Sequence, residues 1–221
     1  MMVFSDEQIK KAVIDQLYWD ARVDVSDVKV EVSDRNVTLT GTVPSYGARQ
    51  AAETDAFIIE GVLSVKNDLQ VKFAPGVTIP TDEALTANIE TLMEWHPNID
   101  TTDIAVSANS GRVILEGSVK TYWEKMSAQD LVATLGGVVA ITNLLTVVPS
   151  EKIVDQVIAD DIISALDRNA MVDAQDIDVK VENGIVTLTG TVSSASASRA
   201  ATTIGWYTKG VRDVQNNLIV A

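Results

Sequence analysis

The chain contains one histidine, His96, which is the first residue to consider for acid–base chemistry. It stands in the segment EWHPNID, at the end of an amphipathic stretch and directly before Pro97. A histidine that acts as a general base needs a nucleophile or a carboxylate within hydrogen-bonding reach. No serine or cysteine motif of a nucleophilic enzyme accompanies it. The sequence therefore predicts a histidine at a helix end or on the surface, and no catalytic residue.

Aspartates form the second group that could do chemistry. Asp173, Asp176 and Asp178 superficially resemble a calcium loop, and Asp160 and Asp161 add charge nearby. A calcium loop also needs a central glycine and a closing glutamate at fixed offsets, and both are missing here. We interpret these residues as solvated acids and predict no metal and no cofactor. A site for a monovalent cation built from backbone carbonyls would leave no side-chain pattern, so that alternative stays open.

Aromatic residues are the third group, and they favour binding over catalysis. Trp123 is flanked by Lys120 and Lys125, whose ammonium groups could contact a phosphate, and Trp206 is followed by Tyr207. These five residues are the candidate binding residues. Large aromatic side chains can pack within or between domains, or form an exposed surface for a phospholipid or a protein partner. The sequence is compatible with both packing and a binding surface.

Composition limits the class of protein. The chain has 17 basic and 31 acidic residues, and its net charge of −14 argues against binding of nucleic acid, because phosphate contacts need clustered cations. A hydrophobic content of 46% is enough for a packed core. The absence of cysteine excludes disulfides and thiol chemistry. No apolar run reaches the roughly 20 residues that a transmembrane helix requires.

The amino-terminal segment MMVFSDEQIKKAV lacks the basic region and apolar stretch of a secretory signal. The sequence as written therefore predicts a cytoplasmic protein. A periplasmic location is the alternative, if a signal segment has been removed. The oligomeric state is left open.

One seven-residue pattern occurs three times, as VTLTGTV at Val37–Val43 and Val186–Val192 and as VILEGSV at Val113–Val119. Three further positions keep constant offsets from its glycine: an aspartate before it, and a glycine and an asparagine after it. The three sets are Asp27, Gly41, Gly61 and Asn67; Asp103, Gly117, Gly137 and Asn143; and Asp176, Gly190, Gly210 and Asn216. The period of about 70 residues is typical of small tandem domains. We predict domains at residues 5–73, 80–149 and 150–221.

The same periodicities predict the elements of each copy. Alternation of apolar and polar residues predicts a strand before each seven-residue pattern and a second strand in the pattern itself. Asn183-Gly184 and Asn109-Ser110-Gly111 favour tight hairpins, whereas Asp34-Arg35-Asn36 is a weaker turn. Amphipathic helices precede the first strand and follow the second, and a last strand ends each copy. We predict three α+β domains, each a two-layer αββαβ sandwich whose two helices cover one face of a three-stranded sheet.

Several details of these elements are also predicted. Ser5 and Gln8 form a capping box at the first helix, and Thr121 and Glu124 form another. The pattern glycine marks a bulge or the close approach of a helix, and the later glycine occupies the C′ position after a helix. The apolar stripes of the first helices are Ile9, Val13, Ile14 and Leu17; Leu85, Ile89 and Met93; and Val157, Ile162 and Leu166. Pro149 and Ser150 predict a tight second junction, and residues 73–81 a looser first one.

This combination of elements resembles the BON domain, which is named for bacterial osmotically induced and nodulation proteins. The third copy carries the pattern most fully, at Asn183-Gly184, Val186–Val192, Gly210-Val211 and Asn216-Asn217-Leu218. The first copy lacks the turn glycine, and the second has Glu116 within the strand. The resemblance covers nearly the whole chain.

The resemblance implies a non-enzymatic module linked to osmotic and envelope stress, with phospholipid contact in several members. It supplies no catalytic residue, because the shared positions are glycines and strand residues that determine shape. The leading hypothesis is therefore a stress-associated binding protein that contacts a phospholipid, the envelope or a protein partner. The alternative is a cytoplasmic sensor of a small solute or of a cation such as potassium.

Overall fold

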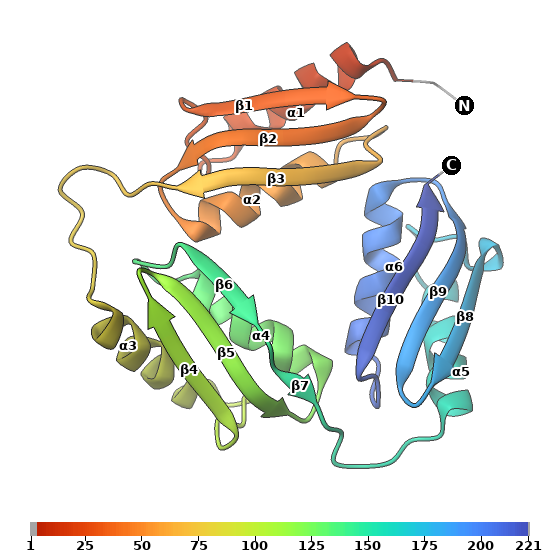
Figure 1. Cartoon of the computed structure of the whole chain (residues 1–221). Coiled ribbons are helices and arrows are strands. Elements are labelled where there is room, and N and C mark those ends of the chain that lie inside the picture. The colour runs from red at the N-terminus through yellow and green to blue at the C-terminus, as the bar shows by residue number, and fades with distance from the viewer. Residues whose placement is uncertain (1–3, 221) are drawn as a thin grey trace. The chain divides into compact units, whose positions relative to one another are not determined.

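The computed structural model describes residues 4–220, and one order of elements, helix–strand–strand–helix–strand, occurs three times in it (Figure 1). The first repeat contains α1 (Asp6–Trp19), β1 (Val28–Ser33), β2 (Asn36–Val43), α2 (Tyr46–Phe57) and β3 (Ser64–Val71). The second contains α3 (Asp82–Glu94), β4 (Ile104–Asn109), β5 (Arg112–Val119), α4 (Tyr122–Ala133), β6 (Ala140–Asn143) and β7 (Thr146–Val147). The third contains α5 (Asp155–Asp167), the short 3-10 helix η1 (Ala174–Asp176), β8 (Ile177–Glu182), β9 (Ile185–Val192), α6 (Ala195–Tyr207) and β10 (Asp213–Val220). The predicted α+β class is confirmed.

Each sheet is built around the strand that carries the seven-residue pattern. In the first repeat β2 pairs antiparallel with β1 and parallel with β3, and Leu39 lies opposite Val30 and Asn67. The third repeat has the same arrangement, with β9 between β8 and β10. In the second repeat β5 lies between β4 and β6, and the last strand is interrupted before it continues as β7 beside β5. The two helices of each repeat lie on the same side of its sheet (Figure 1).

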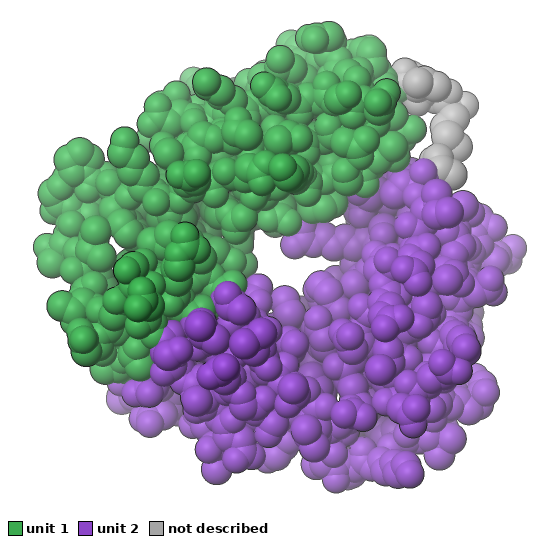
Figure 2. Space-filling model, in the orientation of Figure 1, with its two compact units in different colours: residues 1–88, 108–113, 132–141 green, residues 89–107, 114–131, 142–221 purple. Residues whose placement is uncertain are grey.

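Contacts along the chain divide it into two compact units (Figure 2). Unit 1 contains residues 1–88, 108–113 and 132–141, and unit 2 contains residues 89–107, 114–131 and 142–221. Unit 1 thus holds the whole first repeat, unit 2 holds the whole third repeat, and the second repeat is divided between them. The domain bounds at 5–73, 80–149 and 150–221 stay a prediction.

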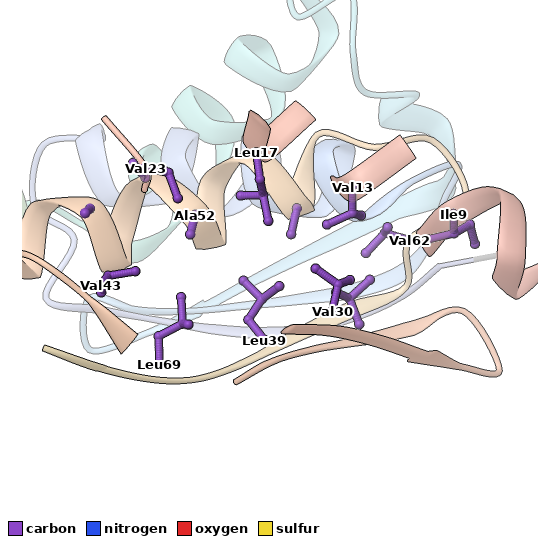
Figure 3. Packing of buried hydrophobic residues seen from close by; sticks show 14 residues of the cluster. Ile9, Val13, Leu17, Val23, Val30, Leu39, Val43, Ala52, Val62 and Leu69 are labelled. Atoms are coloured by element: carbon purple, nitrogen blue, oxygen red, sulfur yellow. The ribbon is translucent and has the colours of Figure 1, made fainter. Parts of the chain in front are cut away.

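The core of the first repeat lies between the helices and one face of the sheet. Figure 3 shows Val13 and Leu17 of α1 and Ala52 of α2 directed toward Val30 and Leu39 of the strands, and all five side chains are buried. The opposite face of the sheet carries polar residues, of which Lys29 and Glu31 are exposed. A sheet with one buried face explains the period-2 alternation of its strands.

Two members of the predicted helix stripes are wrong. The Ile14 side chain is 44% exposed and that of Val157 is 49% exposed. In α5 the buried residue is Ile158, which lies four residues before Ile162, and the same four-residue spacing connects the buried residues of α1. A neighbouring residue on a helix is rotated by about 100°, so Ile14 and Val157 turn away from the sheet. The capping box of Ser5 and Gln8 is confirmed.

The pattern glycine allows two backbone segments to approach each other closely. A Cβ atom added at Gly41, Gly117 or Gly190 would lie 1.9, 1.8 or 2.0 Å from the carbonyl oxygen of the aspartate at the start of the first strand. The φ angles of these glycines lie between +113° and +122°, a region that L-residues rarely adopt. In the first two repeats the N–H group of the next residue donates to that aspartate carbonyl. Of the two predicted roles of this glycine, the close approach of a helix is wrong, because the close neighbour is the backbone of the adjacent strand segment. The bulge stays a prediction.

A carboxylate at the first residue of the first helix holds the hairpin turn in every repeat. Two consecutive backbone N–H groups of the turn donate to the two carboxylate oxygens, at distances of 2.7–3.0 Å. The carboxylates are those of Asp6, Asp82 and Asp155. Both turn residues have positive φ angles, which glycine and asparagine adopt most readily. This support explains how the first repeat places Asp34 and Arg35 in a turn that lacks glycine. The two N–H donors also hold the pKa of Asp82 below its usual range.

The recurrent asparagine connects the second helix to the last strand. Its side-chain N–H group donates to the backbone of that helix at 2.8 Å in the first two repeats, through Asn67 to Arg49 and through Asn143 to Lys125. In the third repeat Asn216 donates instead to the hydroxyl oxygens of Ser198 and Thr202. Its side-chain oxygen accepts from the backbone two residues further along the strand in all three. The asparagine thus fixes the distance between helix and strand.

The later glycine does not stand at C′ as predicted. α2 is capped by Ile58 and α6 by Thr208, so Gly61 and Gly210 lie beyond the caps, in the turn that leads to the last strand. Their φ angles are nevertheless positive, at +92° and +90°. A Cβ atom at either position would meet side chains that precede the first helix at 3.0–3.1 Å. The glycine therefore serves close packing as well as the turn.

Asp55 of α2 is the one carboxylate in the buried part of the first repeat, among the residues described. It is 4% exposed, its Oδ1 accepts from Gln16 Nε2 at 3.3 Å, and its Oδ2 is buried without a partner. Burial raises the pKa of Asp55, and so does the neighbouring Asp20 carboxylate, whereas the Arg22 guanidinium lowers the pKa of Asp20. The corresponding residues of the other repeats are apolar, Leu131 and Ile204.

The contact at the pattern glycine gives the first prediction. Gly190→Ala is expected to lower the free energy of unfolding by at least about 2 kcal/mol, because the new Cβ needs both a strained φ and displacement of the Asp176 backbone. Urea unfolding followed by circular dichroism measures this change. Gly76→Ala is the matched control: φ at Gly76 is +86°, but nothing lies within 4 Å of the added Cβ. Equal losses in the two variants would contradict the role of the close contact.

Asp55 gives the second prediction. A carboxyl whose pKa is raised on folding stabilises the protein fully only when it is protonated, and this contribution is lost as pH rises through the folded-state pKa. Asp55→Asn is neutral at every pH and should therefore raise the free energy of unfolding at pH 7 by about 1 kcal/mol. The gain should disappear below the unfolded-state pKa, at about pH 3.8. Asp15→Asn, at an exposed position of α1, should change stability by less than about 0.5 kcal/mol. A gain of equal size at pH 3 and pH 7 would refute this account.

Candidate functional site

A cleft of about 620 Å³ lies within unit 2 and is called the aromatic cleft below. Three segments line it. They are residues 97–100, which follow α3; Thr121, Trp123 and Glu124 at the start of α4; and residues 206–209 at the end of α6. Three of the five candidate binding residues, Trp123, Trp206 and Tyr207, therefore line one cleft.

Local structure explains how the segments reach the cleft. Thr121 Oγ1 accepts a hydrogen bond from the N–H group of Glu124 at 3.1 Å, which fixes the start of α4. The Glu124 carboxylate accepts from the N–H group of Lys120 at 2.7 Å. Thr121 thus caps the helix as predicted, whereas the return hydrogen bond of the capping box goes to the residue before Thr121. At the other end, a Cβ atom at Gly205 would lie 3.1 Å from Val214 Cγ2. This glycine lets the end of α6 lie close to β10.

Ring contacts hold the aromatic residues in place. The rings of Tyr122 and Trp206 are stacked, with centroids 5.3 Å apart and planes inclined by 13°. The Trp123 ring lies 6.1 Å from that of His96, and the Lys125 ammonium lies 5.7 Å from the centroid of Tyr122. Burial raises the pKa of Tyr122. Offset stacking and cation–π contact of this kind each contribute up to about 1 kcal/mol at half-buried sites.

Two polar ring atoms beside the cleft have no hydrogen-bond partner among the described residues. They are Trp206 Nε1 and His96 Nδ1, and both atoms are buried. A buried N–H group without a partner costs about 1–3 kcal/mol, which a bound acceptor would recover. Trp206 lines the cleft, but its indole nitrogen has almost no accessible surface, so a ligand could reach it only after the ring moves.

The lysines near the cleft are engaged with neighbouring groups. Lys120 Nζ lies 2.6 Å from the Asp100 carboxylate, and this pair lowers the pKa of Asp100 and raises the pKa of Lys120. Lys209 lines the cleft and lies 3.3 Å from Glu151, with both side chains at least 70% exposed. Exposed ion pairs are weak and exchange readily with a ligand. Lys209 is therefore the most available cation at the cleft.

The sequence identified the aromatic residues but not their partners. Tyr122, Asp100 and Lys209 were missed. Tyr122 gives a signal, because it forms an aromatic doublet with Trp123. Asp100 and Lys209 give none, since their roles depend on segments that meet only in the folded chain.

The other candidate residues lie outside this constellation or take part in local structure. His96 follows the end of α3, as predicted, and is half-buried against Trp123. Asp173 caps η1 by accepting a hydrogen bond from the N–H group of Gln175 at 3.2 Å. Within residues 4–220, no group of three or more histidine or acidic side chains is placed to hold a metal ion. Trp19 and Trp95, which end the first helices of two repeats, are 80% and 82% exposed.

Among the described helices, none is long and apolar enough to cross a bilayer. The family model of the BON domain matches residues 5–72, 81–149 and 154–221. This chain belongs to the BON domain family. The resemblance seen in the repeated residues is thereby confirmed for three tandem copies, and the three αββαβ units are BON repeats.

Two curated relatives have similar sequences. Osmotically-inducible protein Y of Escherichia coli is 32% identical over 143 residues, which cover 62% of this chain and 71% of the relative. Outer membrane lipoprotein DolP of Haemophilus influenzae is 33% identical over 137 residues, 60% of this chain and 69% of the relative. The names of these relatives refer to osmotic induction and to the outer membrane. They give no support to the predicted cytoplasmic location.

Among solved structures, CdsD, a structural protein of the type III secretion system of Chlamydia trachomatis, aligns with 97% of this chain and 91% of its own. Its sequence identity is 16% and its TM-score 0.27, so no argument rests on this likeness.

The ring stack of the aromatic cleft gives the third prediction. In a double-mutant cycle of Tyr122→Leu and Trp206→Leu, unfolding should show a coupling energy of about 0.5–1.5 kcal/mol, because each ring loses the other as its stacking partner. Urea unfolding of the four proteins measures this energy. A coupling energy of zero within error would show that the two rings are not in contact in solution.

Proposed function

We propose that this BON protein is a non-catalytic binding protein of the envelope stress response, and that the aromatic cleft binds phospholipid headgroups. The observation that carries the proposal is the cleft itself, in which two tryptophans, a tyrosine and Lys209 meet. Its ligand needs an anionic group for Lys209 and an apolar part for the aromatic rings. A phospholipid provides both.

Exposed aromatic residues support a lipid surface as the source of this ligand. Tyr207 is 60% exposed at the rim of the cleft, and Trp95, in the turn between α3 and the cleft segment 97–100, is 82% exposed. Indole and phenol rings are enriched where an apolar layer meets a polar one, as at a membrane surface. Apolar residues of this size are otherwise mostly buried in a water-soluble protein.

A non-catalytic function agrees with the site. The residues that the repeats share determine the backbone. Of the two carboxylates that line the cleft, Asp100 is paired with Lys120 and Glu124 accepts from the N–H group of Lys120, so both take part in local structure. His96, the natural candidate for a base, is half-buried beside Trp123. We place the protein in the cell envelope because a relative is an outer membrane lipoprotein.

Vesicle co-sedimentation provides the fourth prediction. Tyr207→Ser is expected to weaken binding to vesicles of phosphatidylglycerol and phosphatidylethanolamine about tenfold, because an exposed ring at the rim of the cleft is lost. The exposure of Tyr207 makes this change safe for folding.

Tyr18→Ser is the matched control, because Tyr18 is a tyrosine with 69% exposure in the first repeat. Its vesicle binding should equal that of the unmodified protein. Equal losses in Tyr18→Ser and Tyr207→Ser would refute a lipid site at the cleft. An absence of vesicle binding together with a melting temperature raised by potassium would favour the alternative, a cation sensor.

A further inference from the structure

A second cleft, in unit 1, has a chemical character different from that of the aromatic cleft. Its volume is about 510 Å³, and it is called the arginine cleft here because Arg49 and Arg112 line it. The chain has 31 acidic residues, yet none of the described residues that line this cleft is acidic. The aromatic cleft, by contrast, contains Asp100 and Glu124.

Arg49 is held rigidly at the edge of a sheet. Its Nε donates to the carbonyl of Leu69 at 3.0 Å and its Nη2 to the carbonyl of Asn67 at 2.8 Å. The guanidinium also lies 5.8 Å from the ring centroid of Tyr46. Two of its five N–H groups are used in these hydrogen bonds, and the others keep a fixed direction. A guanidinium that is already ordered loses little entropy when an oxyanion binds.

Arg112 supplies a second cation that the repeat does not need for its fold. It is the first residue of β5 and is exposed. The corresponding residues of the other repeats are Asn36 and Ile185, so a charge at this place has no shared structural role. Arg49 corresponds to Lys125 and Ser198, so a cation stands at its position in two of the three repeats. Arg49 and Arg112 both line the cleft.

The rest of the arginine cleft is largely apolar. Val71 at the end of β3, Val139 before β6 and Ile141 within β6 are half-buried side chains of the lining. A surface of this kind contacts an alkyl or aryl group, and each buried methylene contributes about 0.8 kcal/mol. A ligand that matches both parts combines an oxyanion with a short apolar body.

The net charge of −14 does not oppose such a ligand. At physiological ionic strength the screening length is about 8 Å, so distant carboxylates contribute little inside the cleft. The two guanidinium groups are the charged groups of the lining. The nearby Glu53 carboxylate is occupied by a hydrogen bond from Asn67, whose carbonyl accepts from Arg49. Arginine is the side chain best suited to a phosphate, because its planar fork donates two parallel hydrogen bonds.

We propose that the arginine cleft is a binding site for a phosphate ester with an apolar substituent, held by Arg49 and Arg112. The proposal does not depend on lipid binding at the aromatic cleft, since the two sites share no residue. The ester can be a soluble small molecule or the headgroup of a lipid, and both sources offer the same chemistry to the two arginines.

Calorimetric titration of the full chain with hexyl phosphate tests the site. Saturable binding is expected, at least about tenfold tighter than that of inorganic phosphate because of the apolar contact. Arg112→Gln should weaken hexyl phosphate binding about tenfold by removing a charged donor. Arg168→Gln removes the same charge from an exposed position in the third repeat and should leave binding unchanged. Arg49 is unsuitable for the first test, because its hydrogen bonds to β3 support the fold.

Three results would overturn the proposal: no saturable binding of hexyl phosphate, equal affinities of the Arg112→Gln and Arg168→Gln variants, or equal binding of hexanol. Once the site is established, phosphatidylglycerol vesicles distinguish the two sources of the ester. Vesicle binding that Arg112→Gln weakens assigns a lipid headgroup to the site. Hexyl phosphate binding without an effect of Arg112→Gln on vesicles assigns a soluble ester.

Discussion

In the middle strand of each sheet, a neighbouring carbonyl oxygen occupies the space that the Cβ atom of any residue other than glycine would need. The distance from that oxygen to an added Cβ is 1.8–2.0 Å in all three repeats. Because backbone groups face each other, neither can rotate away as a side chain can. The contact fixes where the first strand begins relative to the second. The pairing of the two strands along the rest of the hairpin, up to its turn, keeps this register.

From that register, two polar side chains determine the positions of the helices. The aspartate at the start of the first helix binds the far end of the hairpin, and the asparagine of the last strand binds the second helix. Both act on backbone or nearby polar groups at short distance, and both recur at fixed offsets in the three repeats. Other positions of the second helix differ among the repeats. Five and eight residues after the pattern glycine they are Tyr46 and Arg49, Tyr122 and Lys125, and Ala195 and Ser198.

The sequence predicted the elements of the three repeats better than it predicted the side-chain contacts that hold them together. Four residues that recur at constant offsets predicted the three αββαβ units, because these residues make the same backbone contacts in each unit. The role of Asp82 could not be predicted, since the hydrogen-bonding partners of its carboxylate lie 28 and 29 residues away.

The predicted helix stripe was wrong at Val157, because a shift of one residue along a helix rotates the side chain by about 100°. Asp55 was not noticed because an alanine-rich helix suggests an apolar interface throughout. The aromatic cleft was predicted in part, as Trp123, Trp206 and Tyr207 differ from their counterparts in the other repeats, whereas Lys209 and Asp100 join it only through folding.

The difference between the two clefts follows from the residues that differ among the repeats. The pair of residues that stands at these positions in the first repeat, a tyrosine with a cation beside its ring, also stands in the second. In the first repeat the pair lines an open cleft that contains another arginine, whereas in the second the tyrosine ring is covered by Trp206. The same pair of residues thus lines the arginine cleft in unit 1, where Arg112 lies near it, and forms an aromatic stack in unit 2, where Trp206 covers the tyrosine. Salt screens interactions between exposed charges beyond about 8 Å. The charges of nearby residues therefore influence a bound ligand more than the net charge of the whole chain does. A tandem array of identical scaffolds can therefore present chemically distinct sites while each repeat keeps the contacts that fold it.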